Sequence, residues 1–364
     1  MPFDPDRPYN DLPDLPPVVE LETRAVTRRT TAAARALAEL KGSGAVVPDQ
    51  RVLINSLVLQ EARASSEIEN IVTTSDEIHR ALEHDPMASS EAREVVRYRE
   101  ALWTGYEMLR TRPLSTNMFI EIASIIRQVD AQIRRNPGTR IQSSAGNVIY
   151  TPPDGENRLR AKLANLENFI HGSNDLDPLV KLAVLHYQFE AIHPFTDGNG
   201  RTGRILCILF LIHAGLLELP ILYLSGYIIR NKNEYYQGLR KVTEQNAWES
   251  WLIYMLDAVE STARDTREKI SGIQKLIDAA VERVRVEAPG IYSKELIEEI
   301  FRRPYCKIRF VQDACGVTRQ TASTYLRKLE SLGLLDMVAE GKEKYYVNRT
   351  LWQLLSGQTS RAQP

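Results

Sequence analysis

The sequence of 364 residues is poor in cysteine and nearly neutral. Its three cysteines are widely spaced and form no CxxC pair: Cys207, Cys306 and Cys315. We therefore expect buried thiols of a reducing cytoplasm, with neither a disulfide framework nor a zinc site. The formal net charge of −1 argues against a general binder of nucleic acid or of membrane surfaces, because such proteins carry a basic excess. Only a local basic region is left for that role.

The sequence also lacks a long apolar run and a secretory leader. Its strongest apolar stretch, Ile205 to Ile212, is far too short to span a bilayer. The first 20 residues are acidic, carry six prolines and show no basic n-region or apolar h-region, which argues against a secretory signal. These absences predict a cytoplasmic protein with no membrane partner, in which the first 20 residues form an extended arm on the surface.

What is present is helical periodicity over most of the chain, which predicts a mainly α fold. The stretch 139–153, TRIQSSAGNVIYTPP, differs, because β-branched and aromatic residues flank Gly146-Asn147 and a Pro-Pro pair follows. That pattern is typical of a β-hairpin. A chain of this length favours two or three domains, and Ala288-Pro289-Gly290 is a suitable boundary.

The segment from His193 to Arg204 concentrates groups that carry chemistry. Pro194 disfavours helical dihedral angles at His193, so the preceding helix should end there and leave the imidazole beside a loop. The loop is rich in glycine and opens directly into an apolar helix, which makes its backbone N–H groups an anion cradle. The residues of this cradle are Gly198, Asn199 and Gly200.

Three charged side chains complete the segment. Arg201 and Arg204 are three residues apart, so their guanidinium groups share a helix face and can fork around phosphate oxygens. Asp197 is the one carboxylate of the loop, and a carboxylate beside a polyphosphate is how proteins usually hold Mg²⁺. A base, a metal ligand, an anion cradle and two cations therefore lie close together in the sequence.

The segment HPFTDGNGRTGR resembles the motif of the Fic family, HPFx(D/E)GNGRxxR, at every specified position. The resemblance implies a helical domain with a β-hairpin flap before the motif. It also implies that His193 deprotonates a target hydroxyl, that Asp197 holds Mg²⁺ and that the loop binds ATP. The implied nucleotide-binding residues of the motif are Gly198, Asn199, Gly200, Arg201, Thr202, Gly203 and Arg204. The related Doc kinases carry lysine at the position of Gly200, and its absence favours nucleotide transfer over phosphate transfer.

Upstream, Ser65-x-x-x-Glu69-Asn70 resembles the Fic inhibitory motif, (S/T)xxxE(G/N). From the residues alone, Ser65 and Glu69 share one side of a last helical turn, and Asn70 suits the left-handed position that ends a helix. The resemblance implies an inhibitory helix at about 51–70, whose Glu69 pairs with Arg204 where the γ-phosphate would lie. We expect that pair to be bidentate and to repel a triphosphate. The alternative is a solvated carboxylate on a capped helix end.

Two further sites are expected. A target strand would pair with the backbone of the flap at Val148, Ile149 and Tyr150. The segment Asn231 to Tyr236 resembles the part of the family fold that closes over the adenosine. Tyr235 and Tyr236 would then contact the nucleoside, and the core of a following helix is an equal alternative.

The C-terminal region predicts a helix, a helix-turn-helix and a two-stranded wing, and it resembles the winged-helix modules of some bacterial Fic proteins. The recognition helix is expected at Thr318 to Leu332 and the wing at Leu335 to Val347. After Gly290, 12 Lys and Arg face 8 Asp and Glu, a local balance of +4. Residues suited to DNA contact are Arg319, Gln320, Thr324, Arg327 and Lys328. Dimerisation or binding of a target protein is the alternative role.

The sequence thus predicts three domains: an N-terminal helical region at 1–110, a Fic domain at 111–287 and a winged-helix domain at 288–364. The expected function is that of an autoinhibited protein adenylyltransferase, which transfers AMP from Mg-ATP to a Ser, Thr or Tyr hydroxyl of a target or of itself. Alternatives are removal of AMP by the same site, transfer of another nucleotide, and a nucleotide-sensing DNA-binding regulator. A homodimer is a further possible state.

Overall fold

The computed structural model describes residues 3–46, 50–82, 85–142, 145–173, 175–340 and 343–356. It confirms a mainly helical fold, and none of the described helices is long and apolar enough to cross a membrane. The chain forms two compact units, one made of Met1–Lys41 with Glu61–Arg264 and the other of Gly42–Gln60 with Asp265–Pro364. The predicted domain boundaries, at about 110 and 287, stay a prediction.

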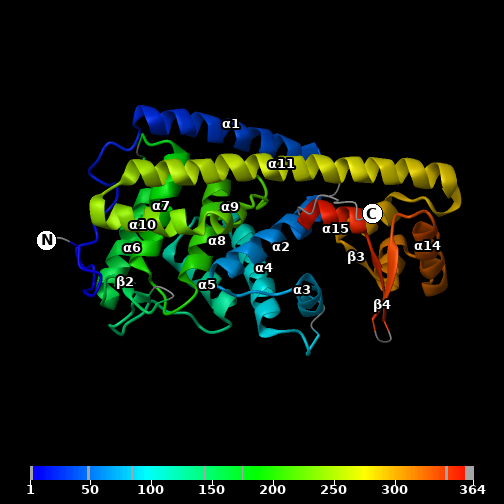
Figure 1. The fold of residues 1–364 in the computed structure, drawn as a ribbon, viewed down its shortest axis with the longest axis horizontal. Helices are drawn as coiled ribbons and strands as arrows, with labels where there is room; N and C mark the ends of the chain where they lie inside the picture. Colours follow the sequence, from blue (N-terminus) through cyan, green and yellow to red (C-terminus); the bar gives the residue numbers. More distant parts are fainter. Residues whose placement is uncertain are drawn as a thin grey trace. The chain divides into compact units, whose positions relative to one another are not determined.

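The first unit is a bundle of helices around two buried ones (Figure 1). Three helices are shared with the second unit: α1 (Arg24–Val46), α2 (Gln50–Ile68) and α11 (Trp248–Glu287). The others are α3 (Ser75–Leu82), α4 (Ser90–Leu109), α5 (Thr116–Arg127), α6 (Glu156–His171), α7 (Pro178–Ile192), α8 (Asn199–His213), α9 (Leu224–Arg230) and α10 (Lys232–Gln245).

Helices α7 and α8 form the centre of this bundle. Nearly every residue of both is buried, as expected for helices that are apolar on all sides. Helix α8 packs against α4, α5 and α7, and α6 covers α7 (Figure 1). The loop 193–198 joins the two central helices, so the predicted chemical segment lies at one end of the core.

The predicted hairpin is present. Strand β1 (Ile141–Gln142) pairs antiparallel with β2 (Val148–Tyr150), with Ile141 opposite Tyr150. Gly146 has a φ of +81°, a left-handed conformation that glycine adopts without steric cost. The expectation of a hairpin is therefore confirmed for the strands, while Ser143 and Ser144 lie outside the described residues.

The N-terminal arm lies along the end of this hairpin. The N–H of Tyr9 donates to the carbonyl of Thr151 at 2.9 Å, and the hydroxyl of Thr151 donates to the carbonyl of Pro5 at 2.6 Å. Further on, the N–H of Leu15 donates to the side-chain oxygen of Asn165 in α6 at 2.7 Å. The arm thus lies on the first unit, as predicted, and it is fixed there by specific hydrogen bonds.

The second unit contains helices and a three-stranded sheet in the order β3-β5-β4. Its elements are η1 (Pro289–Ile291), α12 (Lys294–Arg302), β3 (Tyr305–Cys306), α13 (Ile308–Cys315), α14 (Arg319–Ser331), β4 (Asp336–Glu340), β5 (Glu343–Val347) and α15 (Arg349–Ser356). Gly316 is left-handed between α13 and α14, and Thr318 caps α14 through its side chain. The order of elements follows the prediction, and the winged-helix assignment itself stays a prediction.

The three cysteines carry unbridged thiols. Cys207 and Cys306 are buried, as expected, and burial raises their pKa values. Cys315 departs from the expectation, since it is only partly buried at the end of α13.

The crossing of α4 and α8 gives a test of core packing. A Cβ at Gly105 in α4 would lie 2.7 Å from Leu209 Cδ1 in α8, so Gly105→Ala should overpack the core and cost about 1–3 kcal/mol. Gly42→Ala is the matched control, because it adds the same methyl group to helix α1 with nothing within 4 Å. It should be neutral or stabilise the helix by up to about 1 kcal/mol. Thermal unfolding midpoints measure both changes, and equal midpoints would contradict the packing described.

Candidate functional site

Helix α7 ends where Pro194 predicts. Its last residue is Ile192, and His193 follows in the left-handed conformation, with φ 49° and ψ 60°. The N–H of His193 still donates to the carbonyl of Phe189 at 3.0 Å. A left-handed conformation is uncommon for a residue other than glycine, and no local pattern predicted it here. It turns the chain sharply and sets His193 at the start of the loop.

Asn199 and Thr202 hold the loop in shape. The side chain of Asn199 accepts a hydrogen bond from the N–H of Phe195 and donates one to its carbonyl, both at 2.8 Å. The hydroxyl of Thr202 donates to the carbonyl of Gly198 at 2.8 Å, and Gly198 has a φ of +82°. Two of the predicted nucleotide-binding residues therefore act through their side chains on the loop itself.

The start of α8 has the free backbone N–H groups that the predicted cradle requires, and their binding of an anion stays a prediction. The first intrahelical hydrogen bond runs from the N–H of Thr202 to the carbonyl of Gly198. The N–H groups before it are those that a helix start leaves without an intrahelical acceptor. They belong to Asn199, Gly200 and Arg201, so the cradle runs one residue further along the chain than the sequence suggested. Together with the helix dipole, these groups favour an anion.

Arg204 is buried, with its side chain 1% exposed, and it contacts helix α2. Its Nε donates to the hydroxyl of Ser65 at 2.8 Å, and its Nη2 donates to the carbonyl of Ser65 at 2.9 Å and to Glu69 Oε1 at 2.8 Å. The predicted partner is correct, but the pair is not bidentate. One carboxylate oxygen is bound, because Ser65 takes the other direction of the guanidinium fork. Asn70 ends this helix in the left-handed conformation, with φ 63°, as predicted.

The Glu69 carboxylate lies directly over Gly200. A Cβ at Gly200 would clash with Glu69 Oε1 and would approach Arg204 Nη1 to 3.0 Å. A side chain at this position would therefore have to displace the Glu69 carboxylate. This contact places a negative charge at the amide groups that start α8, the position expected for an anion.

Arg201 turns in another direction. Its Nη1 donates to Glu94 Oε2 in α4 at 2.5 Å, and its Nη2 lies 3.6 Å from Asp197 Oδ2. Each of the two arginines thus has its own carboxylate partner here, and the expectation that they fork around phosphate oxygens stays a prediction. The sequence analysis missed Glu94, which lies 107 residues from its partner and carries no local signal.

Asp197 is the proposed metal ligand, and its side chain is 67% exposed. It lies 3.9 Å from Arg127 Nε. Among the described residues, no group of three His, Cys, Asp or Glu side chains could hold a metal ion by itself. Mg²⁺ commonly takes one or two carboxylates together with phosphate oxygens and waters. A single accessible carboxylate beside the cradle fits that mode of binding.

Glu61 anchors helix α2 one turn before Ser65. Its carboxylate is 1% exposed and accepts hydrogen bonds from the Tyr98 hydroxyl at 3.0 Å and from the N–H and hydroxyl of Ser225. Burial raises its pKa, and these hydrogen bonds oppose that rise. The sequence analysis missed Glu61, although its spacing of four and eight residues from Ser65 and Glu69 puts all three on one helix face.

Glu190 is a second buried carboxyl group that the sequence analysis missed. Its Oε1 has no hydrogen-bond partner, and it packs so closely on Gly203 that a Cβ there would clash with it. Burial raises the pKa of Glu190 to about 7, while Arg204 lowers it and Glu69 raises it. Gly203 is thus needed for packing against α7, which differs from the predicted contact with nucleotide.

His193 is electrostatically suited to accept a proton. Loss of hydration and, after it, the charge of Arg134 lower the pKa of His193 to about 4, although Glu69 and Asp197 act in the opposite direction. The imidazole is therefore neutral at pH 7. A general base within hydrogen-bond reach of a hydroxyl must be in this form.

The two tyrosines of α10 have different surroundings. Tyr235 is 2% exposed, and its hydroxyl lies 2.8 Å from His186 Nε2, so it belongs to the core, as the alternative interpretation held. Tyr236 is 39% exposed. Partial loss of hydration is the main reason that its pKa is raised to about 12, and the nearby Glu69 raises it as well. The predicted nucleoside contact stays a prediction, for which Tyr236 is the accessible residue.

The flap is attached to the last turn of α7. The hydroxyl of Tyr150 donates to the carbonyl of Ala191 at 2.7 Å, and the rings of Phe3 and Tyr9 in the arm lie 6.0 and 6.2 Å from the ring of Tyr150. Val148 and Ile149 are half-buried. The flap therefore holds a fixed position relative to His193, which a docking strand would require.

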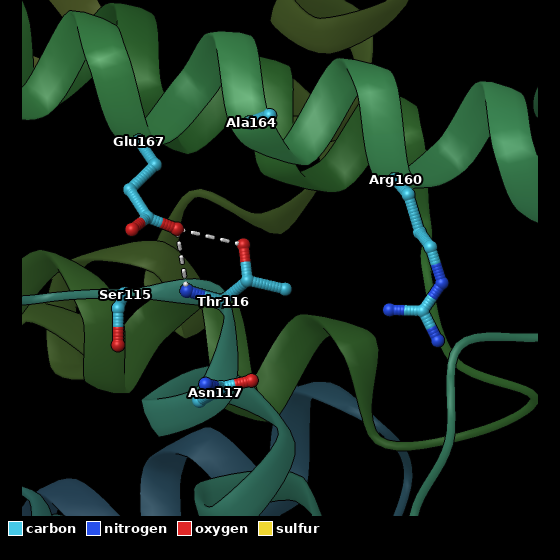
Figure 2. Close-up of a pocket in the computed structure, with 6 residues that line it drawn as sticks. All are labelled: Ser115, Thr116, Asn117, Arg160, Ala164 and Glu167. Atoms are coloured by element: carbon cyan, nitrogen blue, oxygen red, sulfur yellow. Dashed lines mark hydrogen bonds between the residues drawn. The ribbon is translucent and has the colours of Figure 1, made fainter.

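A surface pocket of about 250 Å³ lies elsewhere, between the start of α5 and α6 (Figure 2). Its lining residues are Ser115, Thr116, Asn117, Arg160, Ala164 and Glu167. Glu167 accepts hydrogen bonds from the N–H and the hydroxyl of Thr116 (Figure 2). The carboxylate of Glu167 thus already binds a free N–H group at the start of α5.

Comparison with known families agrees with this geometry. Residues 27–107 match the model described as Fic/DOC family N-terminal, residues 113–211 match Fic/DOC family, and residues 276–351 match the C-terminal domain of SoFic-like protein adenylyltransferases. The chain contains Fic/DOC family domains. The predicted resemblance to the Fic family is therefore confirmed, and the segment 193–204 lies within the residues that match the Fic/DOC model.

Curated relatives match a part of the chain. A probable protein adenylyltransferase of Aquifex aeolicus is 35% identical over 82 residues, 22% of this chain and 23% of that protein. Protein adenylyltransferase fic-1 of Caenorhabditis elegans is 34% identical over 102 residues, 28% of this chain and 19% of that protein. The matched region thus spans about a quarter or less of these relatives.

Solved structures share the fold. A Fic family protein from Desulfovibrio desulfuricans has a TM-score of 0.58 at 19% identity and covers 96% of this chain and 99% of its own. Fic-1 of C. elegans, residues 134–508, has a TM-score of 0.51 at 18% identity and covers 69% and 74%. At these identities the likeness concerns the Fic fold.

Two neighbouring serines test the contact between the Fic motif and α2. Ser65→Ala removes the acceptor of Arg204 Nε and leaves a buried cation short of a partner, which should cost about 1–3 kcal/mol. Ser66 is equally buried, but its hydroxyl has no partner, so Ser66→Ala should be neutral or slightly stabilising. Thermal unfolding measures both. A loss of stability in Ser66→Ala as large as in Ser65→Ala would contradict the contact.

Proposed function

We propose that this protein is an autoinhibited adenylyltransferase. It transfers AMP from Mg-ATP to a serine, threonine or tyrosine hydroxyl of a target protein, which can be the chain itself. The observation that carries the proposal is the hydrogen bond between Arg204 and Glu69 over the first amide groups of α8. A carboxylate at this position competes with a phosphate group for the same cation and amides. The names of the A. aeolicus and C. elegans relatives support the same activity.

In the proposed reaction, His193 accepts the proton of the target hydroxyl. The hydroxyl oxygen forms a bond to the α-phosphorus of ATP, and the bond from that phosphorus to the oxygen bridging to the β-phosphate breaks. Pyrophosphate leaves with the electron pair of that bond, and Arg201 and Arg204 stabilise its charge. General-base help contributes about 10²–10⁴-fold, so His193→Ala should lose at least that much activity.

Asp197 is the proposed protein ligand of Mg²⁺, which neutralises charge on the phosphate oxygens when it is bound. The Asp197 side chain is 67% exposed, so it can turn towards a nucleotide without leaving a buried charge unpaired. When the Asp197 side chain turns away, Arg201 Nη2 loses that carboxylate and can bind a phosphate oxygen instead.

The proposed brake acts through geometry. While Glu69 holds Arg204, the γ-phosphate has no cation to bind, and ATP lies with its α-phosphorus out of line with the target oxygen. Ser65 holds the rest of the guanidinium group, and Glu61 fixes the helix that presents Glu69. Release of Glu69 alone therefore leaves Arg204 in place for the phosphate.

The target strand is proposed to pair with the backbone of β2, at Val148 to Tyr150. Strand β1 occupies one edge of β2, so a target would take the other edge by β-augmentation. Such pairing depends on backbone groups, which fixes a hydroxyl near His193 without demanding a particular sequence.

The second unit supports a second candidate function, a regulator that binds DNA. All five residues suited to DNA contact are exposed on α14: Arg319, Gln320, Thr324, Arg327 and Lys328. Binding to random duplex DNA that weakens steeply with salt would support this role. Contact with a target protein or with a second copy of the chain is the alternative. Absence of salt-dependent DNA binding would favour it, and a dimer mass in light scattering would favour the second copy.

Intact mass spectrometry of Glu69→Gly after incubation with Mg-ATP tests the proposal. We expect one or more AMP adducts on the variant itself or on added lysate proteins, because the phosphate gains Arg204 when the carboxylate is lost. Glu67→Gly is the matched control: it makes the same change two residues away, on another face of α2, and should stay as inactive as wild type.

The double variant Glu69→Gly/His193→Ala should bind ATP without forming the adduct. If the single variant Glu69→Gly forms no adduct with ATP or with other nucleoside triphosphates, the proposal is overturned and a nucleotide sensor is favoured. Addition of wild-type protein to the modified variant tests the alternative reaction, removal of AMP with Glu69 positioning a water. Loss of the adduct there would support it.

The low pKa of His193 predicts how the activity depends on pH. Loss of hydration and the charge of Arg134 disfavour the protonated imidazole, so His193 stays a base well below its ordinary pKa of about 6.5. The single-turnover rate of Glu69→Gly should therefore be level from pH 8 to about 6 and fall only towards the pKa of about 4. Removing Glu69 favours the neutral imidazole further, since its charge raises the pKa. A midpoint near 6.5 would contradict this account.

A further inference from the structure

Arg134, in the segment between α5 and β1, contacts both the flap and the residues around His193. It is 4% exposed. Its Nε donates to the carbonyl of His193 at 2.8 Å, and its Nη2 donates to the carbonyl of Ile192 at 3.3 Å and to that of Pro153, just after β2. Its backbone N–H donates to the carbonyl of Pro194 at 2.9 Å. One residue thus binds three successive carbonyl groups of the turn, those of residues 192–194, and one carbonyl group beside the flap.

These contacts satisfy the end of α7. The last carbonyl groups of a helix have no intrahelical partner, and an arginine there satisfies them and interacts favourably with the helix dipole. Tyr150 binds the carbonyl of Ala191, and Arg134 binds the next two. All three carbonyls are therefore held by the segment that forms and precedes the flap.

The turn at His193 needs such support. A left-handed histidine is uncommon, and a residue persists in a sparsely populated conformation when its surroundings over-determine it. The hydrogen bond from Arg134 Nε acts on the carbonyl of His193 itself. The backbone dihedral angles that this bond helps to hold set the direction in which the side chain of His193 leaves the chain.

We propose that Arg134 is a positioning residue that fixes the imidazole of His193 relative to the flap where the target docks. This inference rests on the proposed function, in which His193 is the base and β2 receives the target. Arg134 touches neither nucleotide nor target in that scheme, because its guanidinium group is directed at backbone carbonyls. Its effect on the reaction passes through His193 and Pro153.

Charge supports the same role. Four groups act on the imidazole besides its loss of hydration: Arg134 before the flap, Glu69 from α2, Asp197 from the loop and the Glu190 backbone from α7. Arg134 is the one among them that favours the neutral ring, and the other three favour the charged ring. Loss of its charge should therefore raise the pKa of His193.

The experiment compares Arg134→Gln and Arg134→Lys in the Glu69→Gly background, with Arg135→Gln as control. Arg135 is the adjacent residue, but its side chain is 68% exposed and it pairs with Glu156 in α6. Three quantities are measured: the single-turnover rate as a function of pH, ATP affinity by calorimetry, and titration of the His193 ring by NMR with labelled histidine. The NMR signal of His193 is identified by its absence in His193→Ala.

We expect Arg134→Gln to react about 10–100-fold more slowly at pH 7.5 with unchanged ATP affinity, because a base displaced by part of an ångström loses much of its effect. The midpoint of the His193 titration should rise by about one pH unit, the least that a nearby charge usually contributes. Arg134→Lys should keep the low midpoint and still lose rate, since lysine retains the charge but not the planar fork. Arg135→Gln should change none of the three quantities.

Rates that fall while the His193 midpoint stays unchanged in folded Arg134→Gln would overturn the inference and leave Arg134 a purely structural residue. Unchanged rates in both variants would overturn it as well. The NMR titration does not require turnover. A raised midpoint in a background without any adduct would therefore support the link between Arg134 and His193 while the proposed transfer of AMP fails.

Discussion

The buried guanidinium group of Arg204 is the constraint on which the site depends. An arginine cannot lose its charge in a protein, so it must find acceptors wherever it is buried. Here Ser65 supplies two of them and Glu69 the third. Ser65 lies in α2 and Glu69 directly follows this helix. The charge of Arg204 in α8 therefore determines where α2 packs. Glycine at position 200 leaves room for this carboxylate.

Carboxylates surround the start of α8, where the proposed function places the phosphate groups. Glu69 binds Arg204, and Glu94 and Asp197 bind Arg201. A nucleotide would replace part of this set. Replacement is feasible at Glu69 and Asp197, whose side chains are 35% and 67% exposed, since the displaced carboxylates can enter water. Glu61 is fully enclosed and satisfied, so it belongs to the scaffold that presents the brake.

Local features were predictable because their causes are local. Pro194 ends α7, Asn70 ends α2 in the left-handed conformation, and α5 spans the residues that its apolar periodicity indicates. The partners of the charged groups were mostly not predictable. Arg201 meets Glu94 across 107 residues, and Arg134 meets His193 across 59. The pair of Glu69 and Arg204, 135 residues apart, was predicted through resemblance to a family and not from periodicity.

The sequence by itself determined the helical fold, the hairpin, and the loop whose glycines and asparagine form an anion cradle, because these depend on dihedral preferences and on hydrogen bonds between near neighbours. Only the tertiary structure decided that Tyr235 is a core residue, that Gly203 packs on Glu190, and that His193 is neutral. Burial and the approach of Arg134 produce that neutrality. Both arise when distant segments pack together, and spacing along the chain carries no record of them.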